Sequence, residues 1–251
     1  MKKRNDTEKL LLILPAFNEG KALPPLLAAC ERTREIIPHL IVVVIDDGSS
    51  DDTAHVVRSF RRPWCRLVQH RKNMGLAAGM RTGIAYAVKT SGKNDLIAVM
   101  DADNSHQPEQ LPQMCGKLRS EVYDVIIASR YQPGSRSAGI PPHRQLFSNV
   151  MSVAFQMIAR VPGVRDYSCG FRVYTAAVLK KALDKYGTID AFITEKGFAC
   201  MTEILLKLAH LPGVRIGEWP MDLRYDRKPS VSKMNVWSTI RDQIALVMRH
   251  R

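Results

Sequence analysis

The sequence predicts an α/β fold in which helices flank a mostly parallel central sheet. Short runs rich in Val, Ile and Leu alternate along the chain with segments whose apolar residues recur at helical spacing. This alternation is typical of parallel strands joined by crossover helices. The chain has 251 residues, which is the length of one large domain. We therefore expect a single domain over residues 1–251.

The first half of the chain predicts four strands, each followed by a helix. The strands are short apolar runs, and polar or proline-containing turns separate them from the helices. In chain order, we expect a strand over 10–15, a helix over about 21–35, a strand over 40–46, a helix from about 51, a strand over 66–69, an alanine-rich helix up to about 88, a strand over 96–100 and a helix from 108.

The second half departs from this regular alternation. A fifth strand over 125–128 is followed by a cluster of Gly and Pro over 133–142, which is typical of a flexible active-site loop. After it we expect a helix over about 144–159, a loop over 166–172, a helix over about 198–209, a strand around 214–225 and a terminal helix. We place a soft boundary near residue 135, which divides the domain into regions 1–135 and 136–234 and a C-terminal helix over 235–251.

The net charge and the arrangement of the cysteines limit the classes of partner and the cellular compartment that we expect. Lys and Arg exceed Asp and Glu by 13, which favours phosphate-rich partners such as nucleotides, nucleic acid or anionic membranes. The five cysteines are scattered and form no Cys-x-x-Cys pair, which is typical of reduced, structural thiols. No apolar run approaches the length of a membrane span. We expect a cytoplasmic protein, either free or peripheral at the cytoplasmic membrane face.

Acidic residues follow the fourth predicted strand, where Asp101-Ala102-Asp103 comes directly after the apolar run 96–100. Two carboxylates at the end of a strand can hold Mg²⁺ or Mn²⁺, which prefer oxygen ligands and keep positions for water and substrate phosphates. The same pattern also occurs in solvated loops and helix caps. The pair therefore indicates a metal site for a phosphate-containing substrate only if other segments of the chain supply further residues for such a site.

Other polar loops are expected beside this pair, because ligands of open parallel sheets bind beyond the carboxyl ends of the strands. The loops over 15–19, 46–51, 101–105 and 129–131 should converge there. Asp47 is placed to accept hydrogen bonds from a nucleobase or ribose, whereas Ser50 or Asp51 suits a helix cap. The chain lacks Gly-x-Gly-x-x-Gly and Gly-Lys-Ser/Thr loops, which argues against dehydrogenases and ATPases.

Several motifs in the same order together resemble family-two glycosyltransferases of the GT-A fold, and in particular the dolichyl-phosphate (polyprenyl-phosphate) mannosyltransferase group. They are Pro15-Ala16-Phe17-Asn18-Glu19, Asp46-Asp47-Gly48-Ser49, the run from Asp101 to Glu109, Ser129-Arg130-Tyr131, the run from Ser168 to Tyr174, and Asp226-Arg227 followed by Ser232-Lys233. The resemblance covers nearly the whole chain. It implies a Rossmann-like, mostly parallel central sheet flanked by helices, with a smaller acceptor-side region.

The resemblance also implies roles for individual residues. The nucleotide-sugar site would consist of Pro15, Phe17, Glu19, Ile45, Asp47, Asp101, Ala102, Asp103, Arg130, Arg144, Arg227 and Lys233. Within it, Asp103, Arg130, Arg227 and Lys233 would be catalytic, and Asp101, Asp103 and Ser105 would meet Mg²⁺ or Mn²⁺. The chain departs from the group at Ser105, where one branch has a metal-binding glutamine, and at Ser230, where the group has glycine.

The implied reaction is inverting, metal-dependent transfer of a hexose from a nucleotide sugar, with mannose from GDP-mannose as first choice, to polyprenyl or dolichyl phosphate. A phosphate acceptor is already ionised at neutral pH and needs no strong base. An alternative keeps the fold but transfers from UDP-glucose or another sugar nucleotide to a soluble hydroxyl. That reaction needs a base, for which Glu203, Asp166 and Glu195 are candidates.

A third alternative is a non-catalytic basic protein that binds anionic surfaces. Nucleic acid is not an expected partner, because the acidic loops would repel phosphate in the absence of a cation. Residues 236–249 have an apolar face at helical spacing and precede Arg249-His250-Arg251. Such a helix can lie at an anionic membrane surface, or pack on its own domain, a second subunit or a membrane-protein partner. The sequence does not specify the oligomeric state.

Overall fold

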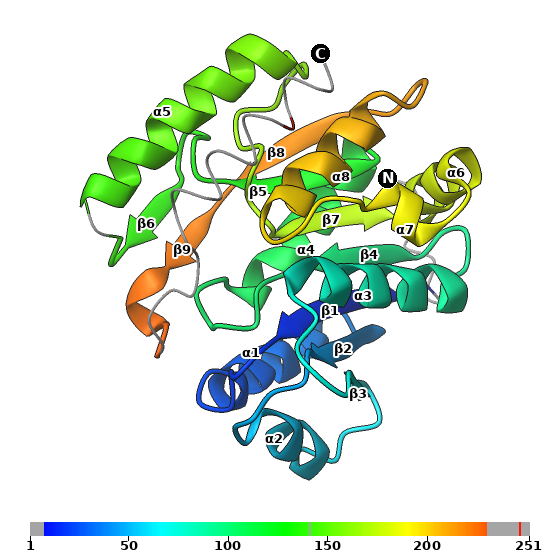
Figure 1. The fold of residues 1–251 in the computed structure, drawn as a ribbon, viewed down its shortest axis with the longest axis vertical. Coiled ribbons are helices and arrows are strands. Elements are labelled where there is room, and N and C mark those ends of the chain that lie inside the picture. The colour runs from blue at the N-terminus through cyan, green and yellow to red at the C-terminus, as the bar shows by residue number, and fades with distance from the viewer. Residues whose placement is uncertain (1–7, 141, 230–245, 247–251) are drawn as a thin grey trace.

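The computed structural model describes residues 8–140, 142–229 and 246, and in them a seven-stranded sheet has the order β3-β2-β1-β4-β7-β5-β8 (Figure 1). Every neighbouring pair is parallel except that β7 is antiparallel to both β4 and β5. The strands are β1 (Leu10–Ala16), β2 (Leu40–Asp46), β3 (Cys65–Gln69), β4 (Leu96–Val99), β5 (Val125–Ser129), β7 (Arg172–Thr175) and β8 (Ile216–Pro220). The predicted mostly parallel sheet is confirmed.

Helices cover both faces of the sheet (Figure 1). The helices are α1 (Leu23–Ile36), α2 (Thr53–Ser59), α3 (Leu76–Thr90), α4 (Leu111–Ser120), α5 (Pro142–Ala159), α6 (Ala176–Tyr186), α7 (Ile189–Phe192) and α8 (Ala199–Ala209), with 3₁₀ turns η1 (Pro108–Gln110) and η2 (Tyr225–Arg227). On one face α1 contacts α2 and α4, and on the other α3 contacts α6 and α7.

The core explains why the inner strands are almost continuously apolar. Val42 to Val44 in β2, Ile97 to Val99 in β4 and Val125 to Ala128 in β5 are fully buried. Strands that are covered by helices on both faces have no solvent side, so they show no alternation of apolar and polar residues. Burial of these side chains is the main favourable contribution to folding.

The antiparallel strand β7 was not expected. Its first residue, Arg172, pairs with Val99 of β4 and Ile127 of β5, so the sheet gains a strand between them. The fully buried Arg172 guanidinium donates to the backbone oxygens of Met201 (2.6 Å) and Tyr167 (2.8 Å). Hydrogen bonds of this kind allow a charged residue to open a central strand. The prediction that 166–172 is a loop is correct only up to residue 171.

Further differences lie in the second half of the chain. The predicted strand around 214–225 is divided at Met221 into β8 and β9 (Asp222–Arg224). The predicted loop over 133–142 contains β6 (Arg136–Ala138), which pairs with β9 in a separate two-stranded ribbon. Sequence reasoning also missed α6 and α7. Because β7 and β8 join the same sheet as β1 to β5, the proposed boundary near residue 135 separates regions of one fold rather than two sheets.

The C-terminal predictions fall largely outside the described residues. Lys233 and the helix expected over 235–251 lie there, apart from Leu246, which is helical and buried in the core. The side chain of Arg144 is also not described, although its backbone belongs to the first turn of α5. Within the described part of the chain, no helix combines the length and apolarity that crossing a membrane requires.

A glycine pair tests the packing of α3 on the sheet. At Gly83 a Cβ would lie 2.3 Å from Ile13 Cγ2 of β1, so Gly83→Ala should lower the free energy of unfolding by about 1–3 kcal/mol through overpacking. Gly116 in α4 has no atom within 4 Å of such a Cβ. Gly116→Ala should therefore raise the free energy of unfolding by roughly 0.5–1 kcal/mol. Urea unfolding of both variants measures the two changes, and equal effects would contradict the close approach at Gly83.

Candidate functional site

The loops that follow β1 and β2 are joined at the carboxyl edge of the sheet, as the sequence predicts. The backbone N–H of Asn18 donates to Ser49 Oγ (2.9 Å), and Asn18 Oδ1 accepts from the backbone N–H of Ser50 (2.9 Å). The backbone N–H of Gly20 donates to Asp51 Oδ2 (2.9 Å). Asp51 Oδ1 also accepts from the backbone N–H of Thr53 (3.0 Å), as a residue at a helix start does.

Asp47 holds the loop that leads into α3. Its Oδ1 accepts from the backbone N–H of Met74 (2.9 Å) and lies 2.7 Å from His70 Nδ1, while its Oδ2 accepts from the backbone N–H of Gly75 (2.7 Å). Gly48 has a φ of +68°, and a Cβ there would lie 2.3 Å from the backbone carbon of Lys72, so the turn requires glycine. Contact between Asp47 and a nucleoside stays a prediction, because its carboxylate is bonded to the protein in this structure.

The other residues predicted for the nucleoside pocket differ in their access to a ligand. Pro15, Phe17 and Glu19 are half-buried at the end of β1. Ile45 is fully buried, and its Cγ1 would lie 3.3 Å from a Cβ at position 83 under α3. The Ile45 side chain therefore belongs to the core, so any contact with a nucleoside would come from its backbone.

Asp103 is held in a defined orientation at the end of β4. Its Oδ1 accepts from the backbone N–H (3.0 Å) and the Oγ–H (2.6 Å) of Ser105. Its Oδ2 accepts from Lys228 Nζ at 2.5 Å. Burial would raise the pKa of Asp103, but Lys228, His106 and the hydrogen bond from Ser105 together lower it. Since Ser105 donates its hydroxyl proton to Asp103, its role as a metal ligand stays a prediction.

Asp101 lies in the same charged cluster and keeps 32% of its side chain exposed. Removal from bulk water and the neighbouring Asp103 raise its pKa, while His106, Lys228 and Arg130 partly offset this effect. His106 Nδ1 accepts from the backbone N–H of Asp101 (3.3 Å), so a neutral imidazole carries its proton on Nε2, which lies 4.0 Å from Asp101 Oδ2. The predicted residues Asp101, Asp103 and Arg130 thus belong to one charged cluster, and their roles toward a ligand stay a prediction.

Gly170 permits the loop before β7 to approach this cluster. A Cβ at Gly170 would lie 3.3 Å from Asp101 Oδ1 and 3.4 Å from Met201 Cε. Phe171 stacks on the His106 ring with 5.4 Å between centroids and is itself fully buried. Phe171 therefore packs under the loop over residues 101–107, which follows β4 and which we call the acidic loop. This contact explains part of the motif around Gly170 by packing rather than by ligand contact.

The segment from Arg224, the last residue of β9, to Lys228 binds the acidic loop through hydrogen bonds and an ion pair. The backbone N–H of Arg224 donates to the Ser105 oxygen (2.8 Å), and Arg227 donates through NH1 to Gln107 Oε1 (2.6 Å). Lys228, which sequence reasoning did not select, reaches Asp103 from the same segment. Its only sequence signal is its position directly after the Asp226-Arg227 motif. These bonds bring Arg227 beside the acidic loop, and its role in binding the diphosphate stays a prediction.

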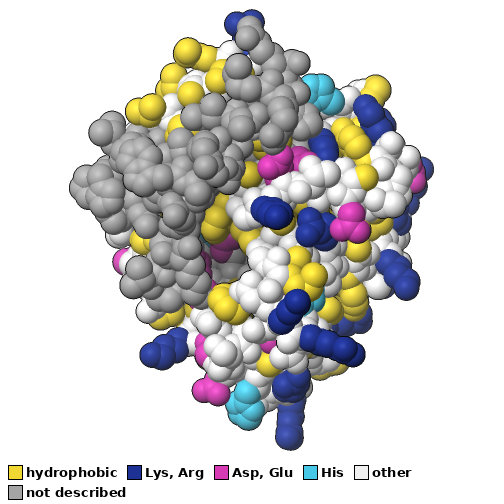
Figure 2. Space-filling view, in the orientation of Figure 1, with side chains coloured by type: hydrophobic (Ala, Val, Ile, Leu, Met, Phe, Trp, Pro, Cys, Tyr) yellow, Lys and Arg dark blue, Asp and Glu magenta, His cyan; other side chains and the backbone are white. Residues whose placement is uncertain are grey.

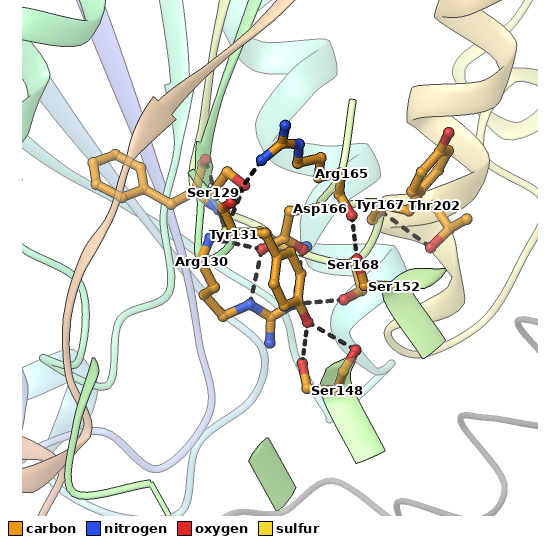
Figure 3. A network of polar contacts seen from close by, with 12 residues as sticks. Ser129, Arg130, Tyr131, Ser148, Ser152, Arg165, Asp166, Tyr167, Ser168 and Thr202 are labelled. Carbon is orange, nitrogen blue, oxygen red and sulfur yellow. Dashed lines mark hydrogen bonds and ion pairs between the residues drawn. The ribbon is translucent and has the colours of Figure 1, made fainter. Parts of the chain in front are cut away.

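Arg130 is bound to Asp166 by a bidentate ion pair (Figure 3). Its Nε donates to Asp166 Oδ2 (2.8 Å), its NH2 donates to Asp166 Oδ1 (2.7 Å), and its NH2 also donates to Ser168 Oγ (2.8 Å). Asp166 is fully buried and also accepts from the backbone N–H of Cys169 (3.1 Å). Burial alone would raise the pKa of Asp166, but Arg130 and these hydrogen bonds hold it below its usual value.

Two of the three candidate bases are occupied by structural bonds, which corrects that part of the sequence analysis. Asp166 stays ionised against Arg130 and is a poor proton acceptor. Glu203 is fully buried, and its carboxylate accepts from Lys207 Nζ (2.6 Å) and from the backbone N–H groups of Thr194 and Glu195 (both 2.8 Å). Glu203 therefore fixes the loop before α8 and has no access to a substrate. The role of Glu195 as a base stays a prediction.

The Arg130 site is connected to α5 through a wider network (Figure 3). Tyr131 donates its hydroxyl to the Ser148 backbone oxygen (2.8 Å). Ser152 donates to the Arg165 backbone oxygen (2.7 Å), and Arg165 NH1 donates to the Tyr131 backbone oxygen (3.3 Å). These bonds anchor the helix that carries Arg144 to the edge of the site.

The carboxylates of the acidic loop fit a hard divalent cation. Asp103 Oδ2 already binds a cationic group, the Lys228 ammonium, and the partly exposed Asp101 lies in the same cluster. In the residues that the structure describes, no group of three or more His, Cys, Asp or Glu side chains forms a complete metal site. The remaining ligands would then be water and substrate phosphates, as is usual for Mg²⁺.

Part of the positive charge of the chain lies on the face of the molecule that Figure 2 shows. On the face shown in Figure 2, Lys and Arg side chains are scattered over the side formed by α2, β3 and α3. The cations of the site instead come from the loops after β5 and β9. The cationic groups that face the acidic loop are therefore a local arrangement rather than part of that scattered surface charge.

Comparisons with known proteins place the chain among sugar-transferring enzymes. It matches the family model described as glycosyl transferase family 2 over residues 11–183. It is 31% identical over 229 residues to an undecaprenyl-phosphate mannosyltransferase of Micrococcus luteus, covering 90% of this chain and 88% of that protein. It is 28% identical over 240 residues to a dodecaprenyl-phosphate galacturonate synthase of Rhizobium johnstonii, covering 93% of this chain and 64% of that protein.

A solved structure supports the fold. Glucosyl-3-phosphoglycerate synthase from Mycobacterium tuberculosis, in complex with Mn²⁺, UDP and glucosyl-3-phosphoglycerate, has a TM-score of 0.65 against this chain. The match has 16% sequence identity and covers 97% of this chain and 80% of that one. At this identity the likeness concerns the fold alone.

The Arg130–Asp166 pair predicts a pH-dependent stability. Because the pKa of Asp166 lies below its unfolded value of about 3.9, the pair stabilises the fold above that pH and the contribution is lost as pH falls through the folded pKa. Asp166→Asn should lower the free energy of unfolding at pH 7 by about 3–5 kcal/mol, and the difference from the wild type should shrink below about pH 4. Urea unfolding between pH 7 and pH 3 measures this.

The control for this variant is Asp190→Asn, which removes a carboxylate that pairs with Arg81 and is 81% exposed. Exposed ion pairs contribute little, so the control should unfold like the wild type at every pH. Equal stability of Asp166→Asn and Asp190→Asn at pH 7 would contradict the structural role of the buried pair.

Proposed function

The chain belongs to glycosyltransferase family 2, and from this premise we propose that it transfers a hexose from a nucleotide sugar to a polyprenyl phosphate. That it is a glycosyltransferase with the GT-A fold is established by the family match and the structure. The donor, the acceptor, the metal and the inverting mechanism are the proposal. The observation that carries it is the meeting of Asp101 and Asp103 with cationic side chains from separate segments of the chain.

The acceptor class has broader support than the sugar. The relative from Micrococcus luteus is named for undecaprenyl phosphate and mannose, and the relative from Rhizobium johnstonii for dodecaprenyl phosphate and galacturonate. The lipid phosphate is common to both names, whereas the sugar differs. We therefore propose a polyprenyl or dolichyl phosphate as acceptor, with mannose from GDP-mannose as the first sugar to test.

The acidic loop would bind the donor together with Mg²⁺ or Mn²⁺. The metal would supply positive charge that bridges the carboxylates to the donor diphosphate and stabilises the leaving group. Ser105 fixes one oxygen of Asp103, so the other oxygen points into the site in a single orientation. A carboxylate held in this way loses less conformational freedom when it binds a ligand.

The basic residues would act on the charge that develops during transfer. Attack on the anomeric carbon releases a nucleoside diphosphate, and cations placed in advance stabilise it without reorganisation. Arg227 is held beside the acidic loop by Gln107, and Arg130 is held by Asp166 and acts electrostatically on Asp101. We propose that these two, with Lys233 and Arg144, surround the donor diphosphate and the acceptor phosphate. Direct displacement by the acceptor would invert the anomeric centre.

The occupied carboxylates favour a phosphate acceptor. A hydroxyl acceptor needs a base, yet Asp166 and Glu203 are committed to structural bonds. An acceptor phosphate with a second pKa near 6 is largely ionised at pH 7 and attacks without such help. This contrast is the reason to prefer the lipid phosphate over a soluble sugar or metabolite as acceptor.

Transfer of labelled sugar tests the proposal. The purified chain is incubated with Mn²⁺, undecaprenyl phosphate in detergent, and labelled GDP-mannose or UDP-glucose, and organic extraction measures the lipid product. We expect labelled lipid from one of the donors. Product formed only on soluble hydroxyl acceptors would contradict the proposed acceptor.

The same assay tests Asp103. Asp103→Asn should lower the transfer rate by a factor of about 10² or more, because removal of a charge-stabilising group typically costs that much. Asp184→Asn, on an exposed position of α6, is the matched control and should retain the wild-type rate. Near-normal transfer by Asp103→Asn, with circular dichroism unchanged in both variants, would remove Asp103 from the catalytic site.

A further inference from the structure

The ammonium group of Lys228 binds Oδ2 of Asp103, the oxygen that we expect a metal to use. Its Nζ lies 2.5 Å from Asp103 Oδ2, whereas both donor groups of Ser105 bind Oδ1. Resting on the proposed function, we propose that Lys228 is a built-in cation that competes with the divalent metal for Asp103. We propose further that the ammonium group of Lys228 moves to the donor diphosphate when the metal replaces it at Asp103.

Burial makes such a counter-ion necessary in the free enzyme. Asp103 is 8% exposed, and the side chain of Lys228 is 13% exposed. A carboxylate with so little access to water is costly unless a positive group neutralises it. Before metal and donor arrive, Lys228 supplies that charge. Displacement of Lys228 therefore opposes binding of the metal alone.

The side chain of Lys228 can move while its backbone stays in place. The segment is anchored by the bond from the Arg224 N–H to Ser105 and by the bond from Arg227 to Gln107. The backbone N–H of Lys228 also donates to the Tyr225 oxygen (3.3 Å). Lysine carries its ammonium group on a flexible four-carbon stem. Rotation of this stem can move the charge from Asp103 to a phosphate oxygen nearby.

The charges of the loaded site favour this transfer. A divalent cation neutralises the two carboxylates of the acidic loop, and the two negative charges of a sugar-nucleotide diphosphate then need two cations. Arg227 is one of the cations at the loop, and the displaced Lys228 adds another. Metal and nucleotide diphosphate should therefore assist one another's binding, with Lys228 responsible for part of the coupling.

Binding of Mn²⁺ to the full chain tests this role without measuring activity. Electron paramagnetic resonance of free Mn²⁺ gives its Kd in the absence of nucleotide and at saturating GDP or UDP, corrected for Mn²⁺ held by free nucleotide. The variants are Lys228→Met, Lys228→Gln and Lys228→Arg. Lys117→Met is the matched control, because it removes a lysine that pairs with Glu121 on the surface of α4. Thermal unfolding establishes that each variant is folded.

We expect Lys228→Met and Lys228→Gln to bind Mn²⁺ without nucleotide about tenfold or more tightly than the wild type, since close charge pairs are coupled by at least this factor. The tightening of Mn²⁺ binding by nucleotide should be smaller in both variants than in the wild type. Lys228→Arg and Lys117→Met should resemble the wild type. The glutamine variant separates loss of charge from loss of a hydrogen-bond donor.

Two results would overturn the inference in distinguishable ways. If Asp103→Asn abolishes Mn²⁺ binding while the Lys228 variants bind like the wild type, the metal site stands and Lys228 is not its competitor. If Asp103→Asn binds Mn²⁺ as the wild type does, the proposed metal site itself is wrong and the role of Lys228 falls with it.

Discussion

The site depends on one electrostatic constraint, which is that carboxylates at the buried end of β4 must be matched by positive charge. Asp103 is nearly buried, and the ammonium group of Lys228 supplies its positive partner. Asp101 interacts electrostatically with His106, Lys228 and Arg130. The cationic partners come from loops that are distant in sequence. This requirement explains why the segment after β9 is held against the acidic loop, and why the site suits a ligand that brings phosphates together with a metal.

The topology of the sheet brings those segments together. In a purely parallel sheet, only the loops that follow strands reach the carboxyl edge. Because β7 runs antiparallel between β4 and β5, the loop that precedes it also arrives there, and Gly170 comes close to Asp101. The same loop carries Asp166, which holds Arg130. The antiparallel strand β7 thus brings a further loop to the site, on a side that the parallel strands alone would leave open.

Much of this arrangement was predictable from the sequence, and the exceptions have physical causes. Strands β1 and β2 are seven-residue, almost continuously apolar runs, so their composition identifies them as buried strands. Strand β7 has four residues and begins with Arg172, whose buried guanidinium donates hydrogen bonds to backbone oxygens that only the tertiary fold brings to it. The only sequence feature that separates Lys228 from surface lysines is its position directly after the Asp226-Arg227 motif. The pairing of Asp166 with Arg130 joins segments 36 residues apart, which no local pattern encodes. Glu203 pairs with Lys207 one helical turn away, but its bonds to the backbone of Thr194 and Glu195 depend on how the preceding loop folds back.

The central claim is that the acidic loop binds a sugar nucleotide through a divalent cation. Isothermal titration calorimetry of GDP-mannose, UDP-glucose and UDP-N-acetylglucosamine, each with and without Mn²⁺, tests it most directly. Our account predicts that one donor binds with clear preference and that its affinity depends on Mn²⁺. Binding that is equally strong without the metal, or the failure of every donor to bind in its presence, would contradict the account.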